Sequence, residues 1–115
     1  LFRSNPANYP LTIRIGDTET VSVTLQDSSG TPVDITGRTY AAQVRATADA
    51  ASTLATFSCS ITNAAAGQFA CTLSATTTRA LSTGVAVWDL EETNSGAVTT
   101  LLAGPVQIVQ DVTRS

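Results

Sequence analysis

Hydrophobic and polar residues alternate along most of the chain. Leu11, Ile13 and Ile15 share one side of an extended segment whose other side carries Thr12 and Arg14. The same period of two recurs over residues 20–27, 40–46, 54–62, 68–74, 85–91, 97–104 and 105–112. This period is typical of strands that bury one face. The pattern therefore predicts a succession of short, half-buried strands.

Turn signals separate these segments. The clearest are rich in Gly, Pro, Asn and Ser, and lie at residues 28–32, 63–67 and 92–96. Such residues favour turns because of their backbone preferences or their side-chain hydrogen bonds. About seven to nine strands with a turn roughly every eight to twelve residues indicate an antiparallel β-sandwich. We therefore expect an all-β fold.

One segment, residues 74–84, breaks the alternation. Ser74 is a suitable helix N-cap, Ala80 and Leu81 are suited to face inward, and Gly84 is suited to end a helix. We expect one short helical turn near residues 75–81.

The first ten residues differ from the rest. Two prolines and two asparagines there discourage regular structure. We expect an N-terminal arm at residues 1–10 and a single sandwich domain at 11–115, since the chain length fits one domain. Two alternatives remain for the arm: a loosely ordered terminus, or a segment that docks on a neighbouring subunit through Phe2 or Tyr9.

Composition narrows the possible partners. Charged residues make up only 13% of the chain and hydrophobic residues 43%, with a net charge of -3. All six basic residues are Arg. Nucleic-acid binders usually carry a basic field, so we expect no nucleic-acid partner. No run of about 18 apolar residues is present, so we expect no membrane span. A weakly charged surface favours a protein that packs against neighbours.

Histidine is absent from the chain. A Ser-His-Asp triad, a Cys-His dyad and a His-based zinc site are therefore excluded within this chain. Four carboxylates are expected in turns, namely Asp17, Asp27, Asp34 and Asp49. A Ca²⁺ site at the acidic run 89–92 would need about six to eight oxygens, which few loops here supply. We expect no enzyme activity, no cofactor and no metal site.

The two cysteines lie on facing halves of a predicted hairpin. A hairpin symmetric about Ala65 places Cys59 opposite Cys71 and Phe57 opposite Leu73. Opposed Cα atoms lie about 4.5–5.5 Å apart, within reach of a disulfide. Two alternatives remain open: a disulfide, or two reduced thiols as in most intracellular proteins.

Trp88 and three arginines complete the set of candidate residues. The strand that carries Trp88 has apolar residues on both faces, so we expect a central strand with Trp88 in the core rather than as a sugar-stacking platform or an interface anchor. Arg38, Arg45 and Arg79 are candidates for ion pairs between subunits, and the alternative is that they face water.

Five segments follow one another in a familiar order. They are D-x-x-G-x-P-V-D-I-T-G at 27–37, Q-V-R at 43–45, T-x-x-L at 78–81, W-D-L-E at 88–91 and G-x-V-x-I-x-x-x-V-T-R at 104–114. In this order the chain resembles a group of small phage virion domains, of the type found at the N-terminus of the upper baseplate proteins of lactococcal phages.

The resemblance implies an immunoglobulin-like sandwich that attaches parts of a virion to each other. It implies other virion proteins as partners, a homo-oligomer in the particle and location in the virion, and it carries no catalytic residue. Tail, baseplate and fibre are the expected positions. Two alternatives stay open: a capsid decoration (cement) protein, and a module that binds host-surface glycans.

Overall fold

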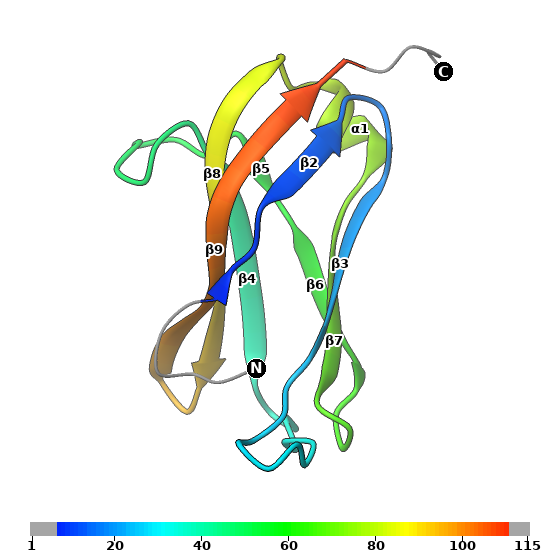
Figure 1. The fold of residues 1–115 in the computed structure, drawn as a ribbon, viewed down its shortest axis with the longest axis vertical. Coiled ribbons are helices and arrows are strands. Elements are labelled where there is room, and N and C mark those ends of the chain that lie inside the picture. The colour runs from blue at the N-terminus through cyan, green and yellow to red at the C-terminus, as the bar shows by residue number, and fades with distance from the viewer. Residues whose placement is uncertain (1–6, 111–115) are drawn as a thin grey trace.

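Two β-sheets pack face to face in the computed structural model, which describes residues 7–110 (Figure 1). The larger sheet has the order β1-β9-β8-β4-β5, and β2 also pairs with β9. Its strands are β1 (Ala7–Asn8), β2 (Leu11–Arg14), β4 (Thr39–Arg45), β5 (Ala55–Thr56), β8 (Gly84–Asn94) and β9 (Ala97–Val109). The smaller sheet, β3-β7-β6, contains β3 (Glu19–Thr24), β6 (Ser58–Asn63) and β7 (Gln68–Leu73). The described residues thus form the expected all-β sandwich.

The chain crosses between the sheets as in the immunoglobulin fold, which divides its strands between two antiparallel sheets. Strands β3, β6 and β7 lie in one sheet, and β4, β8 and β9 lie in the other. The N-terminal strands β1 and β2 run parallel to β9 at the edge of the larger sheet.

The alternation of the sequence becomes the core. Ile13 on β2, Val21 on β3 and Leu90 on β8 are almost fully buried, whereas their neighbours in sequence are more exposed. Tyr40 on β4 stacks on Phe69 of β7, with ring centroids 3.7 Å apart and planes 9° from parallel. This stacked pair connects the two sheets.

The final strand corrects one expectation. Residues 97–109 form the single strand β9, whereas a break at Gly104 and Pro105 was expected. The carbonyl of Ala103 accepts from the Tyr9 amide, so it points toward the N-terminal strands β1 and β2. Backbone groups two residues apart point the same way, so the Pro105 nitrogen points toward these strands as well. The pairing of β9 with them is interrupted there, between β1 and β2. A nitrogen without a hydrogen is tolerated where no ladder bond is needed.

The hairpin of the two cysteines is shorter than expected. The predicted partners Cys59 and Cys71 do face one another. Phe57, however, lies just before β6, and its amide donates to the carbonyl of Ala42 on β4, 2.9 Å away. Phe57 therefore belongs to the crossing between the sheets and has no place opposite Leu73.

A single-turn helix, α1 (Ala75–Arg79), confirms the helical turn expected near residues 75–81. The Ser74 side chain caps it by accepting from the Thr77 amide at 3.2 Å. Buried Thr78 accepts from the Gly16 amide at 3.1 Å and donates to the Asp17 carbonyl at 2.8 Å. The helix thereby fixes the turn between β2 and β3. It ends before Gly84, which begins β8 instead of stopping the helix.

The turn between β8 and β9 is tighter than the expected 92–96. Only Ser95 and Gly96 separate the two strands, and both have positive φ, 51° and 86°. Positive φ at both central residues is characteristic of the type I′ hairpin turn. Glu92 consequently lies within a strand and not in a turn.

Candidate functional site

The outer face of the larger sheet is hollowed beside the loop that joins β4 to β5. We call this feature the outer-face hollow. Its volume is about 600 Å³, and it is lined by Ala41, Gln43, Arg45, Ala48, Val87, Trp88, Asp89, Glu91, Ala103 and Gly104. In Figure 1 the loop projects on the left of the drawing, on the side away from the smaller sheet. Pockets that bind ligands commonly measure about 300–1,000 Å³, so this hollow is large enough to hold one.

Strand alternation divides the acidic run at 89–92 between the two faces of the sheet. Asp89 and Glu91 are half-buried and line the outer-face hollow, whereas Glu92 is 1% exposed and points inward. The run therefore does not converge as a set of metal ligands. Within residues 7–110, no group of three or more His, Cys, Asp or Glu side chains is arranged to hold a metal ion.

Arg45 lines the hollow and is held by two hydrogen bonds. Its Nη1 donates to the Ala50 carbonyl at 2.7 Å, and its Nη2 donates to Gln43 Oε1 at 2.9 Å. The first bond attaches the β4–β5 loop to the end of β4. Arg45, a predicted candidate for ion pairs between subunits, thus has an internal role as well.

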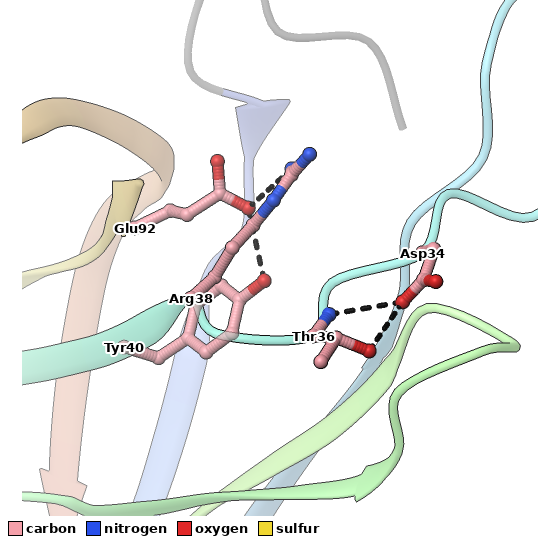
Figure 2. Close-up of polar contacts among 5 residues, drawn as sticks. All are labelled: Asp34, Thr36, Arg38, Tyr40 and Glu92. Atoms are coloured by element: carbon pink, nitrogen blue, oxygen red, sulfur yellow. Dashed lines mark hydrogen bonds and ion pairs between the residues drawn. The ribbon is translucent and has the colours of Figure 1, made fainter. Parts of the chain in front are cut away.

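The buried Glu92 carboxylate gathers two partners from β4 and the residues just before it (Figure 2). Arg38 Nη1 lies 3.2 Å from Glu92 Oε2, and the Tyr40 hydroxyl donates to the same oxygen at 2.9 Å. The Arg38 side chain is 15% exposed. Charged groups inside a protein need such partners because their burial is costly. Arg38, also predicted as an interface residue, serves this internal ion pair.

The loop between β3 and β4 is organised by two exposed aspartates, as their expected turn role implies. Asp34 Oδ1 accepts from the amide and the hydroxyl of Thr36, at 3.0 and 2.6 Å (Figure 2). Asp27 Oδ1 accepts from the amides of Ser29 and Thr31 and from the Ser29 hydroxyl. These bonds stabilise the charged form, so the pKa of each carboxyl lies below its ordinary value.

One further carboxyl has a perturbed pKa. Burial raises the pKa of Glu19 above its ordinary value, and the nearby charge of Asp17 adds to the effect. Glu19 begins β3, on the smaller sheet, so this shift lies outside the outer-face hollow.

Tyr9 lies against the core of its own domain. The Trp88 Nε1 donates to the Tyr9 carbonyl at 2.7 Å, and the two rings meet edge to face with centroids 6.0 Å apart. Gly104 makes this crossing possible, because a Cβ there would lie 2.7 Å from the Tyr9 carbonyl oxygen. Residues 7–10, expected to be part of an arm, therefore lie along the larger sheet. The Tyr9 side chain remains 42% exposed.

Cys59 and Cys71 face one another on β6 and β7, in the expected register, and their sulfurs form a disulfide in the structure. The bond connects neighbouring strands of one sheet, unlike the inter-sheet disulfide of antibody domains. Its formation in the cell stays a prediction.

The three predicted interface arginines lie on different parts of the described domain. Arg38 precedes β4 and Arg45 ends it, whereas Arg79 is exposed at the end of α1. Phe2 lies outside the described residues. Trp88 is 2% exposed and central, as expected for a core residue. The helix of the described region is too short to cross a membrane.

Comparison with known proteins supports the fold. No family model and no curated protein matches the chain. Among solved structures, the chain is similar to the Yersinia pseudotuberculosis adhesin InvE, with a TM-score of 0.51 and 28% identity over 87% of this chain and 24% of that chain. It thus spans about a quarter of the length of the adhesin. The ZIG-8–RIG-5 IG1–IG1 heterodimer aligns with a TM-score of 0.46 and 11% identity, over 92% of this chain and 86% of that chain.

The sandwich is thus immunoglobulin-like, as the sequence resemblance implied. The absence of enzyme activity, expected from a chain without histidine, stays a prediction.

Sequence reasoning missed the outer-face hollow and the buried carboxylate. The order Asp89, Leu90, Glu91, Glu92 held a usable signal, since residues two apart share a face of a strand. It places Asp89 and Glu91 together on one face and Glu92 with the apolar Leu90 on the other. Gln43 and Asp89 face one another across β4 and β8, but that pairing depends on strands far apart in sequence.

Proposed function

We propose that this chain is an attachment module of a bacteriophage particle, acting through protein–protein contacts in the tail, baseplate or fibre. The observation that supports attachment is the likeness of its immunoglobulin-like sandwich to part of an adhesin, at 28% identity over 87% of this chain. The ordered motifs between Asp27 and Arg114 support the phage setting. In this proposal the partners are other virion proteins, and the chain forms a homo-oligomer in the particle.

The surface of the domain suits such contacts. With 13% charged residues, it can be covered without removing many ions from water. Strands β3 and β6 both lie at edges of the smaller sheet. An open edge presents backbone donors and acceptors to which a partner strand can be added.

The glycan-binding alternative has less support from the described residues. Sugar-binding platforms need exposed aromatic faces. Trp88 is 2% exposed, and Tyr9 is the one aromatic among the exposed large hydrophobic residues of the described region. We therefore place protein partners ahead of glycans. Capsid decoration involves the same kinds of contact at another position on the particle.

Quantitative mass spectrometry of purified particles tests this proposal. Dozens of copies or fewer would support a tail, baseplate or fibre position, whereas hundreds would indicate capsid decoration. Absence of the chain from particles would overturn the virion assignment. A glycan array probed with the same chain gives an independent readout, and saturable binding to a defined sugar would favour the glycan alternative.

A further inference from the structure

We propose that the outer-face hollow binds a basic side chain, arginine or lysine, carried on an extended segment of a partner protein. Three features of the hollow support this assignment: its carboxylates, its lining of small residues and its free hydrogen-bond donor. It rests on the proposed attachment role only for the class of partner, a protein.

The floor of the hollow carries two carboxylates that have no counterion among residues 7–110. Asp89 and Glu91 are half-buried, point to the same face of β8 and lie about 6–7 Å apart along the strand. Within residues 7–110 neither has a hydrogen-bond or ion-pair partner, in contrast to buried Glu92. A basic side chain from a partner would supply a counterion for these carboxylates.

The cross-strand neighbours explain why the carboxylates have no such partner. Asp89 lies between Gln43 of β4 and Ala103 of β9, and Glu91 lies between Ala41 and Thr100. None of these four neighbours carries a positive charge. The neighbouring side chains therefore leave the carboxylates accessible from the outer face.

Among the described residues, Arg45 is a basic residue close enough to reach Asp89, and the fold holds its guanidinium elsewhere. It pairs with Val87, which places it diagonal to Asp89, a separation that long side chains can span. Its guanidinium instead donates to the Ala50 carbonyl and to Gln43 Oε1. The β4–β5 loop thus holds Arg45 back and keeps Asp89 available.

The shape of the hollow fits a long basic side chain. Ala41, Ala48, Ala103 and Val87 supply a short apolar lining along which the methylene stem of Arg or Lys can lie while its head reaches a carboxylate. Charge-assisted hydrogen bonds of this kind are about twice as strong as neutral ones.

The hollow also offers donors for the backbone of an extended segment. Gln43 uses its oxygen to accept from Arg45, so its amide nitrogen remains able to donate to a backbone carbonyl of the partner. Carboxylates for a cation and an amide donor for a carbonyl together match a peptide segment that bears a basic side chain.

The test titrates the full chain with a blocked hexapeptide of Gly and Ala carrying one arginine, and follows backbone amide shifts by NMR. We expect saturable shifts at Val87, Asp89 and Ala103. The same peptide with citrulline, which is neutral but similar in shape, should bind at least about tenfold more weakly, because it lacks the charge. The interaction should weaken as salt is raised.

Two variants and a matched control assign the binding to the hollow. Asp89→Asn/Glu91→Gln should weaken binding about tenfold, and Ala103→Leu should weaken it by filling the floor without changing charge. Asp17→Asn/Glu19→Gln removes the same charge from another pair two residues apart, at the turn before β3, and should leave affinity unchanged. A cooperative thermal unfolding transition verifies that each variant is folded.

Equal binding of the arginine and citrulline peptides would overturn the assignment. Equal weakening by both acidic double variants, or shifts confined to the smaller sheet, would overturn it as well. Self-association of the wild-type chain, lost in Asp89→Asn/Glu91→Gln, would identify a second copy as the occupant and overturn the assignment to a different protein.

If the hollow binds the peptide but particles lack the chain, the virion assignment alone fails. If particles contain the chain but the peptide does not bind, the present assignment alone fails.

Discussion

The Glu92 carboxylate shows how much a single side chain depends on its surroundings. It is 1% exposed, and Arg38 and Tyr40 both donate to its Oε2. Replacing Arg38 by Met keeps the length of the side chain but removes the cation. We expect Arg38→Met to lower the free energy of unfolding by about 1–3 kcal/mol, measured by urea unfolding at pH 7.

The double variant Arg38→Met/Glu92→Gln is the control for this prediction. The amide carries no charge that needs a counterion, and its oxygen can still accept from Tyr40. The double variant should therefore be more stable than Arg38→Met alone. A double variant less stable than Arg38→Met alone and than Glu92→Gln alone would show that the ion pair is not what stabilises this region.

At the scale of elements, the N-terminal strand depends on the absence of a side chain from β9. A Cβ at position 104 would lie 2.7 Å from the Tyr9 carbonyl, which accepts from Trp88. Gly104→Ala should displace Tyr9 at a cost of about 1–3 kcal/mol. Because Trp88 is the only tryptophan of the chain, its fluorescence reports the change directly, and we expect a red shift.

Trp88→Phe separates this effect from general strain. It removes the donor to Tyr9 while keeping an aromatic ring. If displacement of Tyr9 causes the loss, Gly104→Ala should cost less in the Trp88→Phe background than in the wild-type chain. Equal costs in the two backgrounds would argue against coupling between Gly104 and Trp88 through Tyr9.

The disulfide acts on another element, strand β6. Most of the side chains of β6 are exposed, so pairing with β7 and the bond from Cys59 to Cys71 hold this edge strand in place. The two cysteines are 12 residues apart. Closure of such a loop stabilises a fold by about 3 kcal/mol in the chain-entropy model, so Cys59→Ser/Cys71→Ser should lose about that amount.

Two measurements check the role of this bond. Intact mass should rise by about two units on reduction, and no rise would show that the thiols are already reduced. Hydrogen exchange should then accelerate most in β6. Uniform acceleration throughout the chain would contradict a local effect.

At the scale of the whole molecule, the shifted carboxyls determine how stability responds to acid. Asp27 and Asp34 have a pKa below the ordinary 3.8, so their contribution is present above that value and lost as pH falls through the folded pKa. Glu19 has the opposite sign, because a pKa above 4.5 means that protonation favours the folded state. We expect the two aspartates to outweigh Glu19, so the net stability should fall below about pH 4.

The variant Asp27→Asn/Asp34→Asn isolates the aspartates. Its urea midpoint should lie below that of the wild-type chain at pH 6, and the difference should shrink toward zero as pH falls below the folded pKa values. Urea midpoints measured from pH 2 to pH 6 cover both the range where the aspartates are charged and the range where they are protonated. A difference that is constant with pH would assign the effect to altered loop geometry and not to charge.

Local signals in the sequence account for much of the fold. The capping role of Ser74, the turn roles of Asp27 and Asp34, and the register of Cys59 with Cys71 all involve residues close together along the chain. Local hydrogen bonds and the period of two suffice to predict these features.

The features that were missed depend on segments far apart in sequence. Gly104 and Pro105 were expected to separate two strands, yet Pro105 is accommodated within β9 because the gap between β1 and β2 falls beside it. Tyr9 was expected to face a neighbour or to be loosely ordered, yet its carbonyl meets Trp88, 79 positions away. Neither arrangement follows from the residues on either side of these positions.

The sequence by itself determined that this chain folds as short half-buried strands in a sandwich, because alternation and turn chemistry act over a few residues. Only the tertiary structure decided which side of each strand is covered and what lies beside it. On β8, that choice buries Glu92 with Arg38 and turns Asp89 and Glu91 to the outer-face hollow. Alternation creates two faces on every strand, and the packing of the second sheet against one of them determines which is the interior.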